Sequence, residues 1–281
     1  MSLAVVDPGG LTTVQDRGRP GLAHLGVPRA GALDAPAAAL ANRVLANPGD
    51  AAVLETTLTG CTLRAERSHW LVVTGAPCPV TVDGRAEPNG QAFFAPAGSE
   101  VVVGPAESGV RSYVAVAGGV AVDPVLGSRS TDTLAWVGPP RLDAGQVLPV
   151  GTPTGELHEH DTPRPLRAEG LRVFPGPRAD WFGPDALAAL CASAYSVGEA
   201  SNRIGLRLSG PRLERVRDDE LPSEGMVLGA VQVPPDGQPV VFLADHPVTG
   251  GYPVVAVVHP DDLWQCAQLR PGDRVSFRRG R

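Results

Sequence analysis

The chain has 281 residues, 43% of them hydrophobic, and a formal net charge of −6, so it can bury a full core and most readily forms two domains. Its 34 glycines and 29 prolines favour many short strands joined by tight turns over long helices. Acidic and basic residues are interspersed, which leaves no continuous positive surface for nucleic acid or anionic lipid. We therefore expect no nucleic-acid partner.

All 24 basic residues are arginines, because the sequence contains no lysine. A Walker A phosphate loop, a Schiff-base enzyme and a biotin carrier each require a lysine, so the chain cannot be any of these by itself. A GC-rich genome that encodes arginine in place of lysine is the simpler cause of this deficit. The chemical exclusion holds for either cause.

The N-terminus has no basic residue before its apolar run, which breaks at Asp7-Pro8, unlike a signal peptide. The longest apolar stretch, Tyr113 to Val122, is about half the roughly 20 residues needed to cross a bilayer. We expect a cytoplasmic protein with no membrane partner. Its cysteines are too widely spaced for a zinc motif or a small disulfide framework, so we expect reduced, mostly buried thiols. These are Cys61, Cys78, Cys191 and Cys266.

Short β-branched runs separated by turn signals fill the first half of the chain and indicate a closed or sandwiched sheet. The predicted strands are Leu11–Asp16, Val53–Leu58, Trp70–Thr74, Val80–Val82, Ala92–Ala95, Val101–Val103 and Tyr113–Val116. Asp83-Gly84 is typical of a two-residue hairpin turn, because both residues tolerate positive φ. One helix is predicted over Asp34–Ala46, with Asp34 as its N-cap and Pro36 in its first turn.

Residues 138–170 are rich in Pro, Gly and charge and lack periodicity, so we place the lobe boundary there. The first lobe with its linker spans 1–165, and the second spans 166–281. Within the linker, His158-Glu159-His160-Asp161 alternates metal-ligand side chains, which on a strand would put both imidazoles on one side. Two histidines leave a zinc site short of ligands, so a solvated loop is favoured and no metal is expected.

The β rhythm resumes in the second half of the chain. The predicted strands are Leu171–Phe174, Arg203–Leu208, Met226–Val233, Val240–Ala244, Val254–Val258 and Arg274–Phe277. Helices are expected near Asp185–Tyr195, after Gly183-Pro184, and over about Asp261–Gln268, after His259-Pro260.

The usual catalytic signatures are missing: there is no Gly-x-Ser-x-Gly elbow, dinucleotide fingerprint or His-Glu-x-x-His. The densest polar cluster contains Glu224 and the run Asp245–Pro253. Here a carboxylate and an imidazole precede Gly250-Gly251, whose unhindered N–H groups can approach an anion or developing oxyanion. A simple turn capped by Asp245, with His246 on the surface, explains the same residues. The local sequence favours neither interpretation.

Two loop clusters, Gln15–Arg19 and Gly127–Thr131, combine hydrogen-bonding groups with guanidinium forks suited to carboxylates. Loop arginines are more often solvated, so both clusters are weaker candidates. In a strand, period-two alternation would place Arg203, Gly205 and Arg207 on one face. Two guanidiniums there could bind an acid or the acidic surface of a partner.

Five blocks occur together and in order: Gly10–Gly18, Leu126–Thr131, Asn202–Gly205, Ser223–Gly225 and Thr249–Pro253. They resemble the family of the 5-oxoprolinase C subunit, also called allophanate hydrolase subunit 2. That family is similar to the second half of the carboxyltransferase region of urea carboxylase, and some relatives antagonise a sporulation-kinase inhibitor. The resemblance implies a mainly β fold: two cyclophilin-like β-barrel lobes with a few short helices.

The resemblance also implies ATP-dependent opening of 5-oxoproline to L-glutamate, carried out with the separately encoded A and B subunits of 5-oxoprolinase. No phosphate loop is visible, so we expect ATP to be bound by an unfamiliar arrangement or mainly on a partner subunit. Two alternatives stay open. One is a carboxyltransferase component acting on urea, allophanate or another amide, with biotin carried by another protein. The other is a regulatory binding partner of a kinase-inhibitor homologue.

By motif position, the resemblance makes Asp245 or Glu224 the proton carrier, with His246 as the alternative. Gly250 and Gly251 N–H groups, with Arg203, would hold the substrate's carbonyl oxygen or carboxylate. The expected substrate-binding residues are Asn202, Arg203, Arg207, Thr249, Gly250, Gly251, Tyr252, Gln15, Asp16 and Arg17.

Two further expectations follow from these positions. His246-Pro247-Val248 and Val254 replace residues that are polar in the family pattern, and polar contacts there would discriminate between small acids and amides. The residues Gln15–Arg17 belong to the first lobe and the others to the second. If all of them serve one small acid or amide, the site lies at or near the contact between the lobes.

Overall fold

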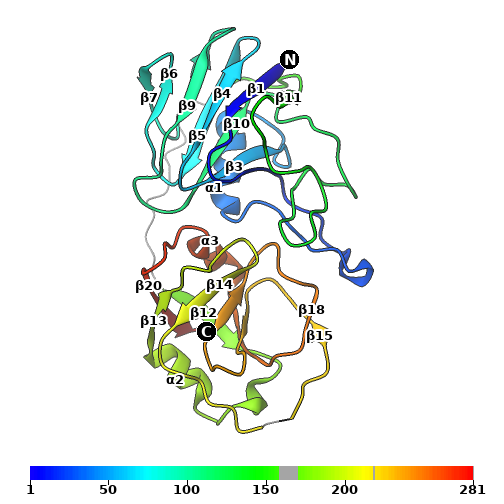
Figure 1. Ribbon diagram of the computed structural model, residues 1–281, viewed down its shortest axis with the longest axis vertical. Coiled ribbons are helices and arrows are strands. Elements are labelled where there is room, and N and C mark those ends of the chain that lie inside the picture. Colours follow the sequence, from blue (N-terminus) through cyan, green and yellow to red (C-terminus); the bar gives the residue numbers. More distant parts are fainter. Residues whose placement is uncertain (158–169, 218, 281) are drawn as a thin grey trace. The chain divides into compact units, whose positions relative to one another are not determined.

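The computed structural model describes residues 1–157, 170–217 and 219–280 and is built mainly of short strands (Figure 1). The chain divides into two units. Unit 1 comprises Met1–Arg19, Ala30–Asp132 and Trp136–Leu166. Unit 2 comprises Pro20–Arg29, Thr133–Ala135 and Arg167–Arg281. Two short segments of the N-terminal half therefore group with unit 2, whereas the sequence had placed them in the first lobe.

Two antiparallel sheets form unit 1. The strands of the first are β1 (Ser2–Asp7), β4 (Cys61–Ala65), β6 (Val80–Val82), β7 (Arg85–Glu87), β9 (Glu100–Val103) and β11 (Val147–Pro149), in the order β11-β1-β4-β9-β6-β7. The strands of the second are β2 (Thr12–Gln15), β3 (Val53–Thr57), β5 (His69–Gly75), β8 (Phe93–Ala95) and β10 (Arg111–Val116), in the order β2-β3-β10-β5-β8. Their facing side chains, such as Leu63 and Leu71, form one buried apolar core.

Helix α1 (Ala35–Val44) buries an apolar stripe with residues of β5 and β10, including Val72 and Tyr113. The Asp34 side chain accepts a hydrogen bond from the Ala37 N–H, as predicted for an N-cap. The Tyr113 hydroxyl accepts from the Asp34 N–H at 2.7 Å and donates to Glu55 Oε2 at 2.8 Å. A buried polar chain thus fixes the start of the helix against the sheet.

The hairpin predicted at Asp83-Gly84 is confirmed. Strands β6 and β7 pair antiparallel across these two residues, whose φ angles are 48° and 78°. Positive φ at both central positions is the backbone of a type I′ turn, whose twist matches that of the flanking strands.

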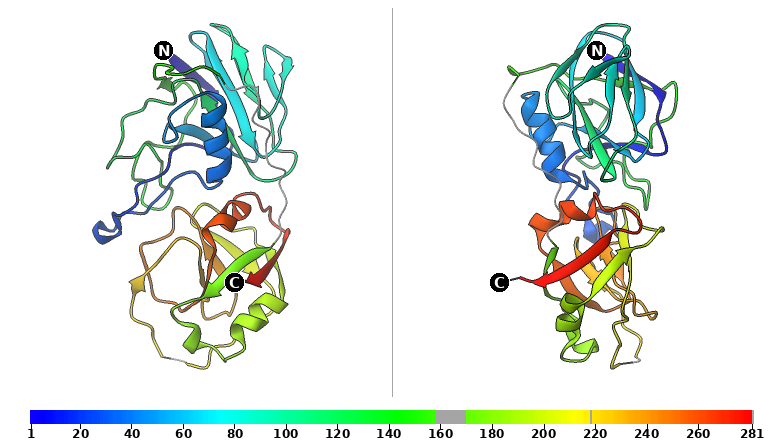
Figure 2. Two further views of the ribbon diagram at one scale, coloured as in Figure 1. Left: turned by 180° about the vertical axis from the view of Figure 1, so that it is seen from behind. Right: turned by 90° about the vertical axis from the view of Figure 1, so that its left-hand side faces the viewer.

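Seven strands close into a barrel in unit 2. They are β12 (Leu171–Pro175), β13 (Ala194–Val197), β14 (Gly205–Ser209), β16 (Ala230–Gln232), β17 (Val240–Phe242), β19 (Val254–Val258) and β20 (Arg274–Arg279). Their order is β12-β19-β16-β17-β14-β13-β20, and β12 (green) lies parallel to β20 (red) in Figure 2. A separate two-stranded ladder joins β15 (Glu224–Gly225) to β18 (Thr249–Gly250). The mainly β prediction is confirmed, with a closed barrel in unit 2 and two sheets in unit 1.

The remaining elements of unit 2 are short helices: η1 (Ala23–Leu25), η2 (Ala179–Trp181), α2 (Ala186–Ala192), η3 (Pro260–Asp262) and α3 (Leu263–Cys266). The predicted helix near Asp185–Tyr195 ended too late. Ser193 is already extended, and Tyr195 lies in β13, where it pairs with Val275 of β20 and is buried. Pairing within the barrel overrides the local helix preference.

All four cysteines are free, and all but Cys191 are buried, as expected for reduced thiols. Among the described residues, no helix is long and apolar enough to cross a membrane. The His158-Glu159-His160-Asp161 motif lies outside the described residues.

Replacing Tyr113 with Phe should destabilise unit 1, because the buried Glu55 carboxylate loses a donor and the Asp34 N–H loses its acceptor. We expect the free energy of unfolding to fall by about 1–3 kcal/mol in urea titrations. Tyr252→Phe is the control, because Tyr252 is 44% exposed. Equal losses for the two variants would contradict the proposed role of the Tyr113 hydroxyl.

Candidate functional site

Asp245 lies three residues beyond β17 and is completely buried, with 0% of its surface exposed. Arg203, which is 2% exposed, holds its carboxylate with both arms: Nε donates to Oδ2 and Nη2 donates to Oδ1, each at 2.9 Å. Thr133 adds its N–H at 2.9 Å and its hydroxyl at 2.7 Å, both to Oδ2. Four donors saturate this carboxylate, which favours a positioning role over proton transfer.

Asn202 explains why Arg203 turns inward. Its side-chain oxygen accepts from the N–H groups of Ile204 and Gly205, which turns the chain immediately before β14. The strand therefore starts at Gly205, and Arg207 is exposed whereas Arg203 is buried. The prediction that both guanidiniums share one strand face was wrong, because period-two alternation applies only inside the strand.

His246 is buried and stacks on Phe242, with ring centroids 5.9 Å apart. Its Nδ1 donates to the Pro247 carbonyl at 2.7 Å, so Nε2 is the acceptor in the neutral ring. Burial lowers the pKa of His246 below its usual value. The ring is therefore neutral at pH 7.

Glu224 pairs with Gly250 across the β15–β18 ladder, so the structure brings this carboxylate to the glycine pair. Arg178 donates to both carboxylate oxygens of Glu224, with Nε 2.9 Å from Oε2. These hydrogen bonds hold the pKa of Glu224 below its usual value. Glu224 is thus ionised and already paired at neutral pH.

The two glycines differ in their surroundings. A Cβ on Gly250 would lie 2.8 Å from Gln232 Nε2 and 3.2 Å from Met226 Cγ, closer than side chains pack. Gln232 Nε2 in turn donates to the Tyr252 carbonyl at 3.2 Å. Among the described residues, a Cβ on Gly251 would meet only the Leu221 carbonyl, at 3.4 Å. A side chain at Gly250 would therefore displace the Gln232 amide or the Met226 side chain, whereas Gly251 faces a more open region.

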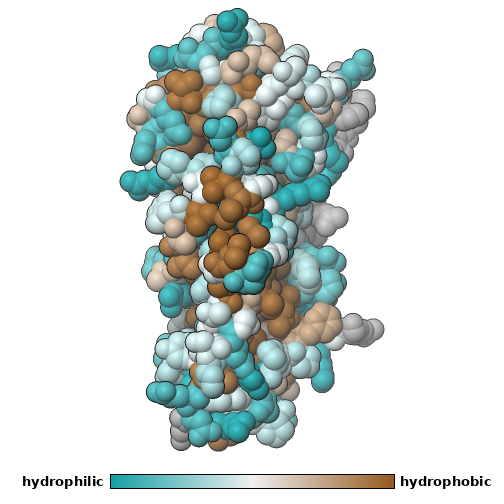
Figure 3. Space-filling view, turned by 90° about the vertical axis from the view of Figure 1, so that its right-hand side faces the viewer, coloured by the Kyte–Doolittle hydropathy of each residue, from teal (hydrophilic) through white to brown (hydrophobic). Residues whose placement is uncertain are grey.

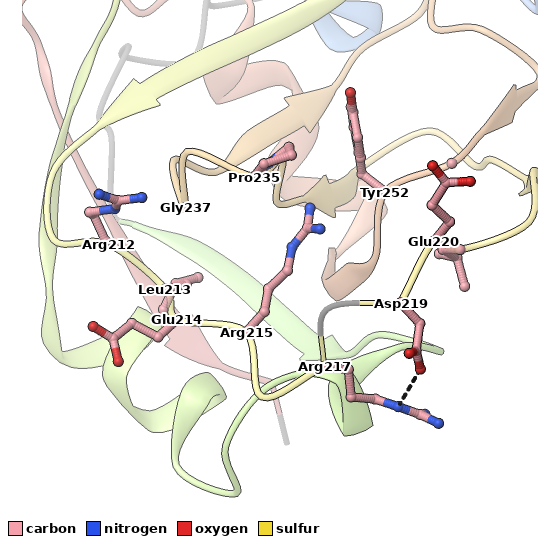
Figure 4. A pocket seen from close by; sticks show the side chains of 12 residues that line it. Arg212, Leu213, Glu214, Arg215, Arg217, Asp219, Glu220, Pro235, Gly237 and Tyr252 are labelled. Carbon is pink, nitrogen blue, oxygen red and sulfur yellow. Dashed lines mark ion pairs between the residues drawn. The ribbon is translucent and has the colours of Figure 1, made fainter.

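Gly251 and Tyr252 line a cavity of about 790 Å³ in unit 2 (Figure 4). The rest of the lining comes from Pro235 and Gly237 and from two runs of chain, 212–215 with Arg217 and 219–221. Arg215 reaches toward Pro235 and Tyr252 in Figure 4, and its Cζ is 5.7 Å from the centre of the Tyr252 ring. Thr249 is exposed and precedes this part of the loop. The cavity is large enough for a small metabolite.

Sequence reasoning missed Arg212, Arg215 and Arg217, which supply the cations of this cavity. They lie outside any helix or strand, so no periodicity marks them. The available signal was three arginines within six residues, shortly before the Ser223-Glu224-Gly225 block.

In unit 1, the structure joins two loop clusters that the sequence had treated separately. Asp16 Oδ1 accepts from the Gly18 N–H and from the hydroxyls of Ser128 and Ser130, and Oδ2 accepts from the Arg129 N–H, all at 2.6–2.7 Å. This carboxylate therefore fixes the loop at residues 128–130 instead of standing open to a ligand.

The neighbours of Asp16 are also engaged within unit 1. Buried Gln15 donates to Thr13 Oγ1 and the Thr131 carbonyl, and Arg17 Nε donates to the Gly49 carbonyl. That these residues share a ligand with unit 2 stays a prediction. Across the described parts of the chain, no group of three or more His, Cys, Asp or Glu could hold a metal ion.

Replacing Arg203 with Ala should leave the Asp245 charge buried with only its Thr133 donors. We expect a loss of about 3–5 kcal/mol in the free energy of unfolding, measured with urea. Arg207→Ala, four residues along the chain and exposed, is the matched control and should change stability by less than about 0.5 kcal/mol. Equal effects would show that the buried pair does not support the barrel.

Replacing Gly250 with Ala should push Gln232 away from the Tyr252 carbonyl, since the added Cβ would lie too close to its amide. We expect a loss of about 1–3 kcal/mol of stability and altered NMR shifts around Tyr252. Gly251→Ala is the control, because its Cβ contact is ordinary. If Gly251→Ala is the more disruptive change, the packing argument fails.

Comparison with known proteins gives consistent results. The family model described as "Carboxyltransferase domain, subdomain A and B" matches residues 25–279. The C subunit of 5-oxoprolinase from Escherichia coli strain K12 is 37% identical over 279 residues, which cover 98% of this chain and 90% of that protein. The crystal structure of TTHA0988 superposes with a TM-score of 0.89 at 40% identity, covering 99% of this chain and 55% of that one.

The crystal structure of Kluyveromyces lactis urea carboxylase superposes with a TM-score of 0.88 at 29% identity. It covers 98% of this chain, whereas this chain spans only 27% of that protein. The chain thus spans about half of the TTHA0988 chain and about a quarter of the urea carboxylase, but nearly all of the E. coli protein. The match to the family model and the identity to these relatives show that the chain belongs to the family described as "Carboxyltransferase domain, subdomain A and B", together with the 5-oxoprolinase C subunit.

Proposed function

We propose that this chain is a subunit of an ATP-dependent 5-oxoprolinase that opens 5-oxoproline to L-glutamate, together with homologues of the A and B subunits of that enzyme. One observation carries the proposal: the 37% identity to the C subunit of E. coli 5-oxoprolinase extends over 90% of that protein. The chain therefore corresponds to nearly the whole of that protein. In the larger relatives it corresponds to only one part.

The chemistry of the cavity supports dependence on partners. A lactam amide is a poor electrophile, so its carbonyl must be activated and a nucleophile must be supplied. Among the described residues that line the cavity there is no serine, cysteine, histidine or lysine. Asp245 is saturated by hydrogen bonds, and Glu224 is paired with Arg178. The described residues of this chain bind and orient the substrate, while a partner supplies the missing reactive group.

An exposed apolar surface also supports a partner. Leu126 and Trp136 are 52% and 56% exposed and adopt φ angles of 51° and 56°, a backbone that side-chain-bearing residues rarely adopt. Arg19 holds the neighbouring residues, because its guanidinium donates to the Val125 and Val137 carbonyls. Brown, apolar side chains are also visible on the surface drawn in Figure 3. Such surfaces commonly mark protein interfaces.

ATP does not fit the described cavity. Three arginines line it together with Glu214, Asp219 and Glu220, so its formal charges balance, and it holds no lysine. A triphosphate requires a strong excess of cationic or N–H donors. We therefore assign ATP to a partner protein.

A carboxyltransferase function is the second candidate, favoured by the matching family model and by the likeness to urea carboxylase. In that case, biotin would have to arrive on another protein, because this chain has no lysine to carry it. The regulatory alternative stays a prediction.

Reconstitution tests the proposal. The purified chain mixed with homologues of the 5-oxoprolinase A and B subunits should form glutamate from 5-oxoproline only when ATP is present, and the chain alone should form none. Full activity of the isolated chain would contradict dependence on partners. Adding avidin separates the candidates: carboxyl transfer from biotin should stop, whereas direct ring opening should continue.

A further inference from the structure

We propose that Arg215 is the receptor for the substrate's carboxylate, so that the cavity of unit 2 selects small anionic carbonyl compounds over neutral amides. The identity of the anion as 5-oxoproline rests on the proposed function. The existence of the carboxylate receptor rests on the geometry of the cavity alone.

Arg203, which the sequence suggested for this role, is not available to a ligand. Both arms of its guanidinium hold Asp245, and the side chain is buried. A substrate carboxylate would have to displace a buried partner that is already ideally placed, which breaks a desolvated ion pair. The receptor must therefore be a different cation.

The three arginines of the cavity differ in how far they are already neutralised. Arg217 pairs with two carboxylates: its Nη1 is 3.0 Å from Asp180 Oδ2, and its Nε is 3.9 Å from Asp219 Oδ2. Its Cζ also lies 5.4 Å from the centre of the Trp181 ring. Its charge is balanced within the protein. Arg212 is exposed, so it remains hydrated and flexible. Neither offers a preorganised, uncompensated guanidinium.

Arg215 offers one. It is half-buried, its Nη2 donates to the Val233 carbonyl at 2.5 Å, and its guanidinium lies over the Tyr252 ring. Tyr252 is itself anchored through its carbonyl by Gln232. These contacts remove much of the rotamer freedom that a flexible arginine would lose on binding a ligand.

The charge of Arg215 has no counterion among the described residues: its contacts there are a neutral carbonyl and an aromatic ring, and its buried Nε has no hydrogen-bond partner. Asp219 is engaged by Arg217, and Glu214 points away from Arg215 in Figure 4. A partly desolvated guanidinium with free donors gains most from a carboxylate, which accepts two parallel hydrogen bonds.

The rest of the wall limits the ligand's chemistry. Leu213, Leu221 and Pro235 add apolar surface beside the Tyr252 ring, so a compact ring or short chain attached to the carboxylate can be buried. 5-Oxoproline has this form. Urea carries neither a charge nor an apolar body, so the same cavity discriminates against it.

Calorimetric titration of the full chain with 5-oxoproline and with 2-pyrrolidinone, the same lactam without its carboxylate, tests the receptor. The wild type should bind 5-oxoproline more tightly. Arg215→Ala should weaken 5-oxoproline binding by about tenfold or more and leave 2-pyrrolidinone binding unchanged. Arg215→Lys keeps the charge but loses the two parallel N–H donors, so its affinity for 5-oxoproline should lie between those of the wild type and Arg215→Ala. Arg274→Ala removes an exposed arginine of β20 and should bind as the wild type does.

Circular dichroism of each variant identifies misfolding, and unchanged 2-pyrrolidinone binding shows that the cavity persists. Wild-type affinity of Arg215→Ala for 5-oxoproline would overturn the receptor but leave the proposed function standing. Titration with acetate, succinate and glutarate tests the carboxylate receptor independently of 5-oxoproline. Binding of these acids that depends on Arg215, with none of 5-oxoproline, would sustain the receptor and contradict the proposed function. Failure of every carboxylate to bind would overturn the receptor.

Discussion

Unit 2 depends on one buried carboxylate. The Asp245 carboxylate accepts two hydrogen bonds from the Arg203 guanidinium and two from Thr133. It therefore connects three segments that are far apart in the sequence. Removing a donor from a buried charge is strongly destabilising, because the charge is left without full compensation. The loop that continues from Asp245 through Gly250 to Tyr252 therefore leaves the barrel from a fixed point.

The charged side chains of the candidate site form two groups: those held by hydrogen bonds within the protein, and those that keep unused hydrogen-bond donors. Asp16, Asp245 and Glu224 are all held by donors of the protein, although the sequence suggested substrate binding for Asp16 and proton transfer for the other two. Arg215 has a defined position but no counterion among the described residues. Satisfied charges shape a site, whereas a preorganised group with unused donors recognises a ligand.

Local chemistry predicted local structure well. Asp83-Gly84 specified its hairpin, and Asp34 with Pro36 specified the start of α1, because turn and cap preferences act over a few residues. Tyr195 was misassigned because its pairing partner is in β20, far along the chain. The contact between Asp16 and Ser128 spans 112 residues, and no sequence period encodes such a contact. The same limit hid Arg215, whose neighbours Val233 and Tyr252 become adjacent only in the folded barrel.

The assignment of Pro20–Arg29 and Thr133–Ala135 to unit 2 has a consequence for biosynthesis. Both segments leave the ribosome before any strand of the barrel exists, and Thr133 precedes its acceptor Asp245 by 112 residues. The contact between Thr133 and Asp245 therefore closes a long loop, at a cost in chain entropy. A gene fragment that begins after the linker would encode every barrel strand but not Thr133. The Asp245 carboxylate of such a fragment would lack two of its four hydrogen-bond donors.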